Sequence, residues 1–226
     1  MERSEGLTRE IEQIARKGGA DLVGFADVAG LAALPRAVSF AIRHQPRALR
    51  APDEMPNPDY HGEYVDFNRR LTEIAERIAA MLRERGYRTI ANPGTAPASE
   101  FDVERLAAPF QHKTAATRAG LGWIGKCALL VTPQLGPGLR LGSLLTDAPL
   151  EVGEPVTESD CGDCMVCVQA CPAEAMTGEN WCAGRPREEF YDAFACREMC
   201  RQRSQERDID AGICGVCMAV CPRRPR

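Results

Sequence analysis

Residues 161–172 read C-G-D-C-M-V-C-V-Q-A-C-P, and residues 214–222 read C-G-V-C-M-A-V-C-P. Ten of the eleven cysteines of the chain fall between Cys161 and Cys221. Gaps of two and three residues between cysteines are typical of metal ligands, whereas a disulfide framework belongs to small secreted domains. The cysteines therefore predict metal centres that hold this end of the chain together.

The first run matches, residue for residue, the C-x2-C-x2-C-x3-C-P pattern of bacterial ferredoxins, in which the fourth cysteine ligates the other of two clusters. One [4Fe-4S] cluster is therefore predicted on Cys161, Cys164, Cys167 and Cys221. The second is predicted on Cys171, Cys214, Cys217 and one further cysteine. Pairs of C-x2-C also make zinc ribbons, but zinc rarely needs three thiols at two-residue gaps followed by C-P.

The missing ligand of the second cluster has three candidates. The segment FYDAFACREMC (190–200) reads as a helix, and its two cysteines lie four residues apart, on one helical face. We favour Cys196, with Cys200 and Cys182 as the alternatives.

Hydrophobic periodicity places regular structure before the cysteines. Helices are expected over 7–17 and 60–85, and strands over 21–27, 37–43, 87–94, 127–132 and 139–147. A Pro-rich surface loop is expected over 45–58, and a hairpin-like connection over 133–138. The pattern predicts an α+β (α/β layered) domain over residues 1–152, followed by a small domain over 153–226 that its cofactors stabilise.

Charge and hydropathy restrict the partners. The net charge is −4 with both signs interspersed, which offers no argument for a nucleic-acid or membrane surface. No stretch approaches the roughly 18 apolar residues of a membrane span, and the first residues lack the apolar segment of a signal peptide. We therefore expect a cytoplasmic protein with no membrane association and without a nucleic-acid partner.

The segment A-G-L-G-W-I-G-K (119–126) is the sharpest feature outside the cysteines. Its three glycines allow backbone to approach a flat or anionic ligand, and Lys126 could bind a phosphate or carboxylate. A tight turn from helix to strand, with Trp123 in the core, is the alternative.

The motifs A-T-R-A-G-L-G-W-I-G-K, L-L-V-T and R-L-G-S-L-L-T-D, followed by the two cysteine runs, resemble the epoxyqueuosine reductase family. D-Y-H (59–61) resembles a further motif of that family, and the likeness extends from about Asp59 onward. The resemblance implies a cobalamin-dependent iron–sulfur protein, related to reductive dehalogenases, that lacks the family's C-terminal helical-repeat extension. It also implies a nitroreductase-like first domain that holds the corrinoid, and a ferredoxin-like second domain with two [4Fe-4S] clusters.

By the same resemblance, a protein donor of the ferredoxin or flavodoxin type would reduce the clusters, and the clusters would reduce the corrinoid. The corrinoid-binding residues would be Ala119, Gly120, Gly122, Trp123, Gly125, Lys126, Leu130, Arg140 and Leu141. A homodimer is compatible with the sequence.

The chain departs from the family pattern where tRNA-active members carry an acidic residue and then E-R. Leu106 and the pair His112-Lys113 stand there, with Asp102 as the nearest acidic replacement. We therefore expect an unidentified small-molecule substrate. The candidate catalytic residues are Tyr60, Tyr64, His112 and Lys113.

Two other functions remain open. The chain could be an electron-transfer protein that reduces or reactivates a corrinoid on a partner protein, with its first domain as a docking module. The first domain could instead hold a flavin.

Overall fold

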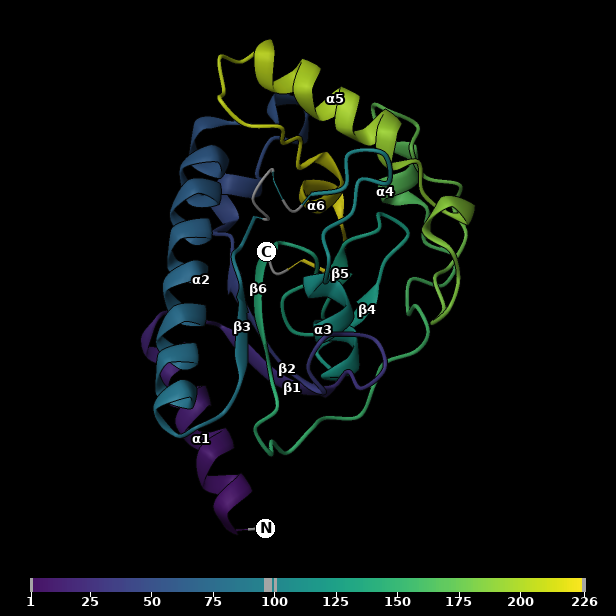
Figure 1. The fold of residues 1–226 in the computed structure, drawn as a ribbon. Helices are drawn as coiled ribbons and strands as arrows, with labels where there is room; N and C mark the ends of the chain where they lie inside the picture. The colour runs from purple at the N-terminus through teal and green to yellow at the C-terminus, as the bar shows by residue number, and fades with distance from the viewer. Residues whose placement is uncertain (1, 96–98, 100, 225–226) are drawn as a thin grey trace. The chain divides into compact units, whose positions relative to one another are not determined.

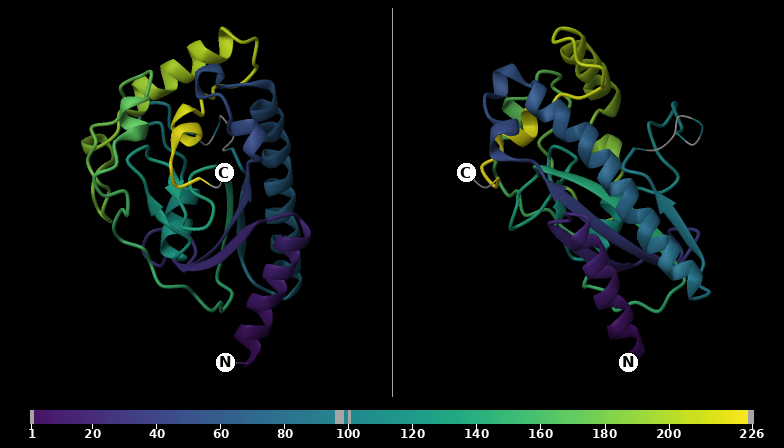
Figure 2. Two further views of the ribbon diagram at one scale, coloured as in Figure 1. Left: turned by 180° about the vertical axis from the view of Figure 1, so that it is seen from behind. Right: turned by 90° about the vertical axis from the view of Figure 1, so that its left-hand side faces the viewer.

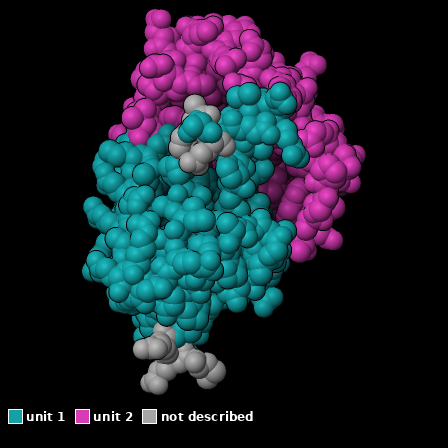
Figure 3. Space-filling model, in the orientation of Figure 1, with its two compact units in different colours: residues 1–43, 66–121, 140–156 teal, residues 44–65, 122–139, 157–226 magenta. Residues whose placement is uncertain are grey.

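The computed structural model describes residues 2–95, 99 and 101–224 (Figure 1). It divides the chain into two compact units (Figure 3). Unit 1 comprises residues 1–43, 66–121 and 140–156. Unit 2 comprises residues 44–65, 122–139 and 157–226. The division differs from the predicted boundary at residue 152, because two segments from the first part of the chain pack with the cysteine-rich part.

Unit 1 is built on a four-stranded sheet in the order β1-β2-β6-β3, in which β1 pairs antiparallel with β2 and β3 pairs antiparallel with β6. Its strands are β1 (Leu22–Asp27), β2 (Arg36–Arg43), β3 (Thr89–Asn92) and β6 (Leu139–Thr146). Its helices are α1 (Glu2–Lys17), α3 (His112–Arg118) and the larger part of α2 (Pro58–Glu84). The mixed helix-and-sheet class predicted from the sequence is confirmed.

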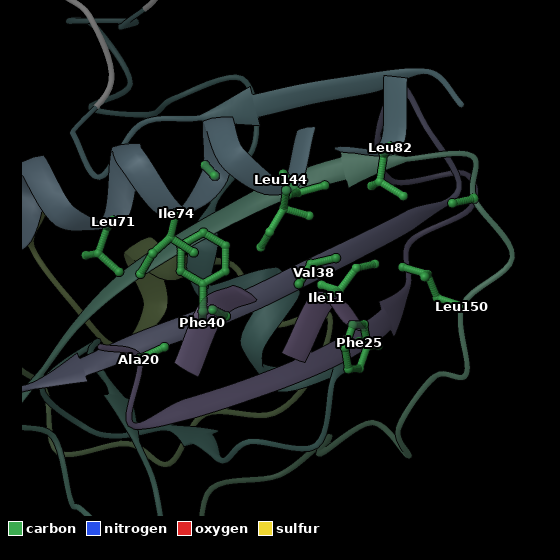
Figure 4. Close-up of a cluster of buried hydrophobic side chains, with 14 of the residues drawn as sticks. Ile11, Ala20, Phe25, Val38, Phe40, Leu71, Ile74, Leu82, Leu144 and Leu150 are labelled. Atoms are coloured by element: carbon green, nitrogen blue, oxygen red, sulfur yellow. The ribbon is translucent and has the colours of Figure 1, made fainter. Parts of the chain in front are cut away.

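One face of the sheet is covered by α1 and α2, which lie in front of the strands in the right-hand view of Figure 2. Alternate residues of β2, namely Val38, Phe40 and Ile42, face these helices because successive side chains of a strand point to opposite faces. The two helices contribute buried residues at helical spacing to the same cluster, among them Ile11, Leu71, Ile74 and Leu82 (Figure 4). This cluster is the main core of unit 1.

The opposite face of the sheet is covered by α3. Small residues predominate there, including Ala26 of β1, Ala37 of β2, and Ala115 and Ala119 from α3 and its end. Small side chains let helix and sheet approach closely. An alanine-rich contact therefore positions α3 on the sheet.

Unit 2 contains short elements joined by long loops. They are the 3-10 turns η1 (Pro46–Leu49), η2 (Pro52–Glu54) and η4 (Arg187–Glu189), the strands β4 (Trp123–Ile124) and β5 (Leu130–Val131), and the helices α4 (Val166–Gln169), α5 (Ala193–Gln205) and α6 (Val216–Val220). The β4 and β5 strands pair with each other. The predicted hairpin between strands 127–132 and 139–147 is wrong, because β5 pairs with β4 and β6 joins the sheet of unit 1.

The Pro-rich stretch over 45–58 is exposed along much of its length, as predicted, but part of it packs inward. Ala48, Leu49 and Met55 are buried against residues that surround α6. Arg203 donates hydrogen bonds to the Met55 carbonyl oxygen at 2.9 and 2.6 Å, and Arg207 donates to the Glu54 carbonyl oxygen at 3.1 Å. Prolines keep this stretch out of a β-sheet ladder, so its carbonyl oxygens need other donors. The two arginines supply them.

Within the described ranges, no helix is both long and apolar enough to cross a membrane.

Candidate functional site

None of the eleven cysteines, all of which the structure describes, forms a disulfide, and the thiols of the first predicted set lie together in unit 2. Cys161 and Cys164 precede α4, Cys167 lies in it, and Cys221 follows α6. Burial raises the pKa of the Cys221 thiol, and the neighbouring thiols of Cys167, Cys161 and Cys164 raise it further. The structure thus brings one thiol from the second run beside three from the first, which is the crossed pairing of the ferredoxin pattern.

The second set gathers around Cys214. A hydrogen bond with Cys200 lowers the pKa of Cys214 to about 6, with help from the guanidinium groups of Arg203 and Arg207. The sulfur atoms of Cys196 and Cys200 are 4.0 Å apart, and the Tyr191 hydroxyl is hydrogen-bonded to Cys196. Both candidate fourth ligands therefore lie near this set.

The other members of the second set are placed by their elements. Cys171 follows α4, and Cys217 lies in α6, which packs on α4. The third candidate, Cys182, is exposed, and its backbone forms an isolated bridge with Glu158. The choice of Cys196 remains a prediction, with Cys200 beside it.

Among the residues that the structure describes, no group of three or more His, Cys, Asp or Glu side chains converges on a point that could hold a single metal ion. A four-iron cube places each thiolate on a different iron, so its ligands are spread around the cluster rather than around one point. The cysteine-rich region fits [4Fe-4S] clusters by its donor type and spacing.

The segment Gly122–Cys127 lies against these thiols, although the sequence suggested a corrinoid site. The Trp123 indole N–H donates a hydrogen bond to the Cys161 sulfur at 3.4 Å. A Cβ added at Gly125 would lie 3.5 Å from the sulfurs of both Cys127 and Cys161. Glycine at this position therefore lets the turn approach the predicted cluster ligands closely.

Cys127 is a functional candidate that the sequence reasoning did not single out. It is buried and forms hydrogen bonds with Cys167 of the first set and Cys217 of the second. The bond with Cys167 lowers its pKa, but Cys217 and burial raise it more, so the pKa of Cys127 lies well above its ordinary value. The only signal in the sequence was a cysteine directly after the glycine-rich segment.

The predicted corrinoid contacts have different surroundings. A Cβ at Gly122 would lie 2.1 Å from the Val131 carbonyl oxygen, and one at Gly120 would lie 2.7 Å from the Glu154 carbonyl oxygen. Lys126 is 4% exposed and donates to the Met165 sulfur at 3.5 Å. The glycines thus allow protein segments to approach one another.

The remaining corrinoid candidates are Ala119 and Leu130, which are buried, and two residues of β6. Arg140 donates from Nε to the Asn68 side-chain oxygen at 2.7 Å and from Nη2 to the Gly94 carbonyl oxygen at 3.0 Å. Arg140 and Leu141 are half-buried. Among these candidates, the two β6 residues therefore keep side-chain surface that a ligand could reach.

His112 begins α3 and is fixed by two hydrogen bonds. Its Nδ1 lies 2.9 Å from the Ser143 hydroxyl and its Nε2 lies 3.1 Å from the Pro93 carbonyl oxygen. Because a carbonyl only accepts, Nε2 carries the proton and Nδ1 accepts from the hydroxyl. Both ring nitrogens are engaged in holding the loop to β6, and Lys113 beside it is half-buried.

The predicted tyrosines lie in unit 2, at the start of α2. Tyr60 is buried, and Tyr64 packs partly buried against the same cluster. The ring of Tyr60 lies 5.0 Å from the ring of His44, whose Nδ1 is 3.0 Å from a Glu63 oxygen. The sequence reasoning did not identify this His44–Glu63 pair, because the two residues come from different elements.

Comparison with known proteins gives sequence matches of moderate identity. No family model matches the chain. It is 30% identical over 154 residues to an epoxyqueuosine reductase of Vibrio cholerae, a match that covers 64% of this chain and 38% of that protein. It is 35% identical over 175 residues to an epoxyqueuosine reductase of Synechococcus sp. strain CC9605, which covers 73% and 46%. The chain therefore spans less than half the length of either relative.

The fold is shared with two groups of solved structures. A catabolic reductive dehalogenase matches with a TM-score of 0.69 at 21% identity, over 96% of this chain and 31% of that one. An epoxyqueuosine reductase in complex with a tRNA stem loop matches with a TM-score of 0.64 at 20% identity, over 97% and 66%. The fold thus defines a class that includes both kinds of reductase. The sequence matches are more specific, and the chain belongs to an epoxyqueuosine reductase-like family.

Proposed function

We propose that this chain is a cobalamin-dependent iron–sulfur reductase, in which two [4Fe-4S] clusters deliver electrons to a corrinoid. The observation that carries the proposal is the crossed thiol pairing, with Cys221 beside Cys161, Cys164 and Cys167. With Cys221 completing the first cube, Cys171 of the first run is left as a ligand for a second. Crossed runs are the arrangement of two-cluster ferredoxins, which supports a ferredoxin-like unit with two clusters.

The ligands of the first proposed cluster are Cys161, Cys164, Cys167 and Cys221. Those of the second are Cys171, Cys196, Cys214 and Cys217. Arg203 and Arg207 place positive charge near Cys214 and so favour its thiolate, the form that ligates iron. Metal binding would add folding free energy to a unit whose elements are short.

The corrinoid is supported by family membership and by the fold shared with a reductive dehalogenase that is described as B12-dependent. When bound, cobalamin supplies a fully reduced cobalt centre that is a strong nucleophile and reductant. The chain's own part would be to hold it and exclude water. Arg140 and Leu141 fit that role best, because Gly122 and Gly125 already have protein atoms in the space a ligand would need.

The substrate to test first is epoxyqueuosine in tRNA. The expectation of a small-molecule substrate without nucleic acid conflicts with the relative that binds an epoxyqueuosine-modified tRNA stem loop. Reduction of an epoxide takes two electrons and two protons. Two clusters that each pass one electron at a time match that demand, and a ferredoxin- or flavodoxin-type protein would supply the electrons.

Asp102 is exposed, and its Oδ1 accepts the backbone N–H groups of Glu104 and Arg105 at 2.9 and 3.0 Å. Leu106, at the aligned acidic position, has a φ of 46°.

The free thiols favour a reducing compartment, so the proposed location is the cytoplasm.

The test begins with anaerobically purified, cluster-reconstituted protein. Iron and sulfide are quantified, cobalamin is titrated while its visible spectrum and cob(II)alamin EPR signal are followed, and an epoxyqueuosine-modified stem loop is added with a reduced ferredoxin. Stoichiometric binding with an altered cobalt signal and conversion of the epoxide support the proposal. Two four-iron clusters without cobalamin binding contradict it.

A second function, electron transfer to a corrinoid or flavin on a partner protein, is favoured by one observation. Gly122 and Gly125, which the sequence suggested as a ligand cradle, lie against protein atoms. In that case the clusters should exchange electrons with a separate corrinoid protein, and no cobalamin should remain bound to this chain after gel filtration.

A further inference from the structure

Trp123 is placed to act on the first proposed cluster. It is 4% exposed, and its indole N–H donates to the sulfur of Cys161 at 3.4 Å. This is a side-chain hydrogen bond to a predicted iron ligand, and the two residues are 38 positions apart in the sequence. The sequence reasoning assigned Trp123 either to a corrinoid or to the core, and neither assignment requires its N–H to face a thiol.

Several contacts hold Trp123 in this orientation. The backbone of Trp123 pairs with Val131 in the β4–β5 ladder. The Arg223 guanidinium lies over the ring at 5.5 Å from the ring centroid. Arg223 is itself fixed to the carbonyl and carboxylate oxygens of Asp160, each at 3.0 Å, and Asp160 immediately precedes Cys161. Arg223 therefore links the ring of Trp123, the donor, to Asp160, the residue next to the acceptor Cys161.

A hydrogen bond to a sulfur that ligates iron changes the relative stability of the oxidised and reduced forms of a cluster. The reduced cube carries one more negative charge than the oxidised cube, and part of that charge resides on the sulfurs. A donor aimed at a sulfur therefore stabilises the reduced form more than the oxidised form and raises the reduction potential. Because the donor is buried and the bond is part-buried, solvent screens it less than it would an exposed bond.

We propose that Trp123 is a positioning residue that raises the reduction potential of the first cluster through its hydrogen bond to Cys161. The inference rests on the proposed ligation of that cluster by Cys161. It is independent of which corrinoid or substrate the protein uses. The step concerned is addition of one electron from the reductant to the oxidised cube, and no bond forms or breaks.

The experiment is an EPR-monitored redox titration with dithionite of the reconstituted full chain and its Trp123→Phe variant. Phenylalanine keeps an aromatic ring but has no N–H. The equilibrium constant for one-electron reduction of one cluster is expected to fall about tenfold, a shift of about 59 mV to more negative potential, while the other cluster is unchanged. Iron content should stay the same.

The other tryptophan of the chain supplies the matched control. Trp181 packs partly buried against Ile124, Ala128 and Phe190, in the same unit. Trp181→Phe should leave both potentials unchanged. Equal shifts in the two variants, or shifts of both clusters together, would show a general packing effect and overturn the inference.

A shape-matched replacement covers the case in which Trp123→Phe loses iron. In the Trp181→Phe background, tryptophan is replaced by 3-benzothienylalanine, which puts sulfur in place of the indole N–H at position 123 alone. The same negative shift supports the inference, and unchanged potentials overturn it. If the unsubstituted protein takes up fewer than two four-iron clusters, the ligand assignment fails and the inference fails with it. Absence of cobalamin binding or epoxide turnover would contradict the proposed function alone.

Discussion

The stability of unit 1 should depend on acid through His112. Burial of the imidazole lowers the pKa of His112 to about 4; its hydrogen bond to the Pro93 carbonyl opposes this shift, and the charge of Arg140 adds to it. The residue is therefore neutral in the folded protein at neutral pH. A proton on Nδ1 would break the acceptor role of that atom toward Ser143.

The sign and size of the effect follow from linkage. Between pH about 4 and about 6.5 the unfolded chain binds a proton at this position and the folded chain does not, so stability rises with pH. The stabilisation is present above the unfolded value and is lost as the pH falls toward the folded value. From about pH 7.5 to about pH 5, the free energy of unfolding should fall by about 2 kcal/mol through this one group.

The assay compares the protein with its His112→Gln variant, whose amide can donate and accept but does not titrate. Urea unfolding of anaerobic, reconstituted protein is followed by circular dichroism at both pH values. The variant should lose about 2 kcal/mol less than the unsubstituted protein on acidification. Equal losses in the two proteins would refute the assignment of a buried, neutral His112.

Three further outcomes are expected. Gly122→Ala should destabilise the protein by on the order of 3 kcal/mol in urea unfolding, because the added Cβ would lie 2.1 Å from the carbonyl oxygen of Val131 in β5. The control is Gly62→Ala in α2, where a Cβ meets open space, and this variant should be neutral or stabilising by about 0.5–1 kcal/mol. Cys164→Ala should lose about half of the iron and the EPR signal of one cluster, and exposed Cys182→Ala should lose neither; full iron in the first variant would contradict the ligand assignment. Cys196→Ala should lose the other cluster, and retention of both clusters would indicate that its neighbour four residues on is the ligand.

Local patterns predicted the elements of unit 1 well. The helical periods that include Ile11, Ile74 and Leu82 and the alternation along β2 are consequences of one-sided burial, which a sequence records directly. The strand over 127–132 was predicted too long and with the wrong partner. Only Leu130–Val131 is a strand, because the turn before it lies against the thiols.

The proximity of Cys221 to the first run could be predicted, because ligand spacing is a rule of cluster chemistry rather than of folding. The contacts of Trp123 and Cys127 with the sulfurs of predicted ligands could not be predicted, because they join segments that are far apart in the sequence and follow no period. Burial in the Pro-rich stretch was missed for a related reason. Prolines exclude regular ladders, but they do not exclude packing when arginines such as Arg203 satisfy the carbonyls.

The crossed thiol pairing also sets an order of events during biosynthesis. In the proposed assignment, each cube takes at least one ligand from residues 214–221, so neither can be complete while the ribosome is still translating the loop before them. Residues 161–171 must then wait with their thiols reduced, and Cys164 is already exposed in the folded chain. Cluster insertion would therefore follow synthesis of residues 214–221, and the protein would depend on a carrier that delivers clusters after that segment has been made.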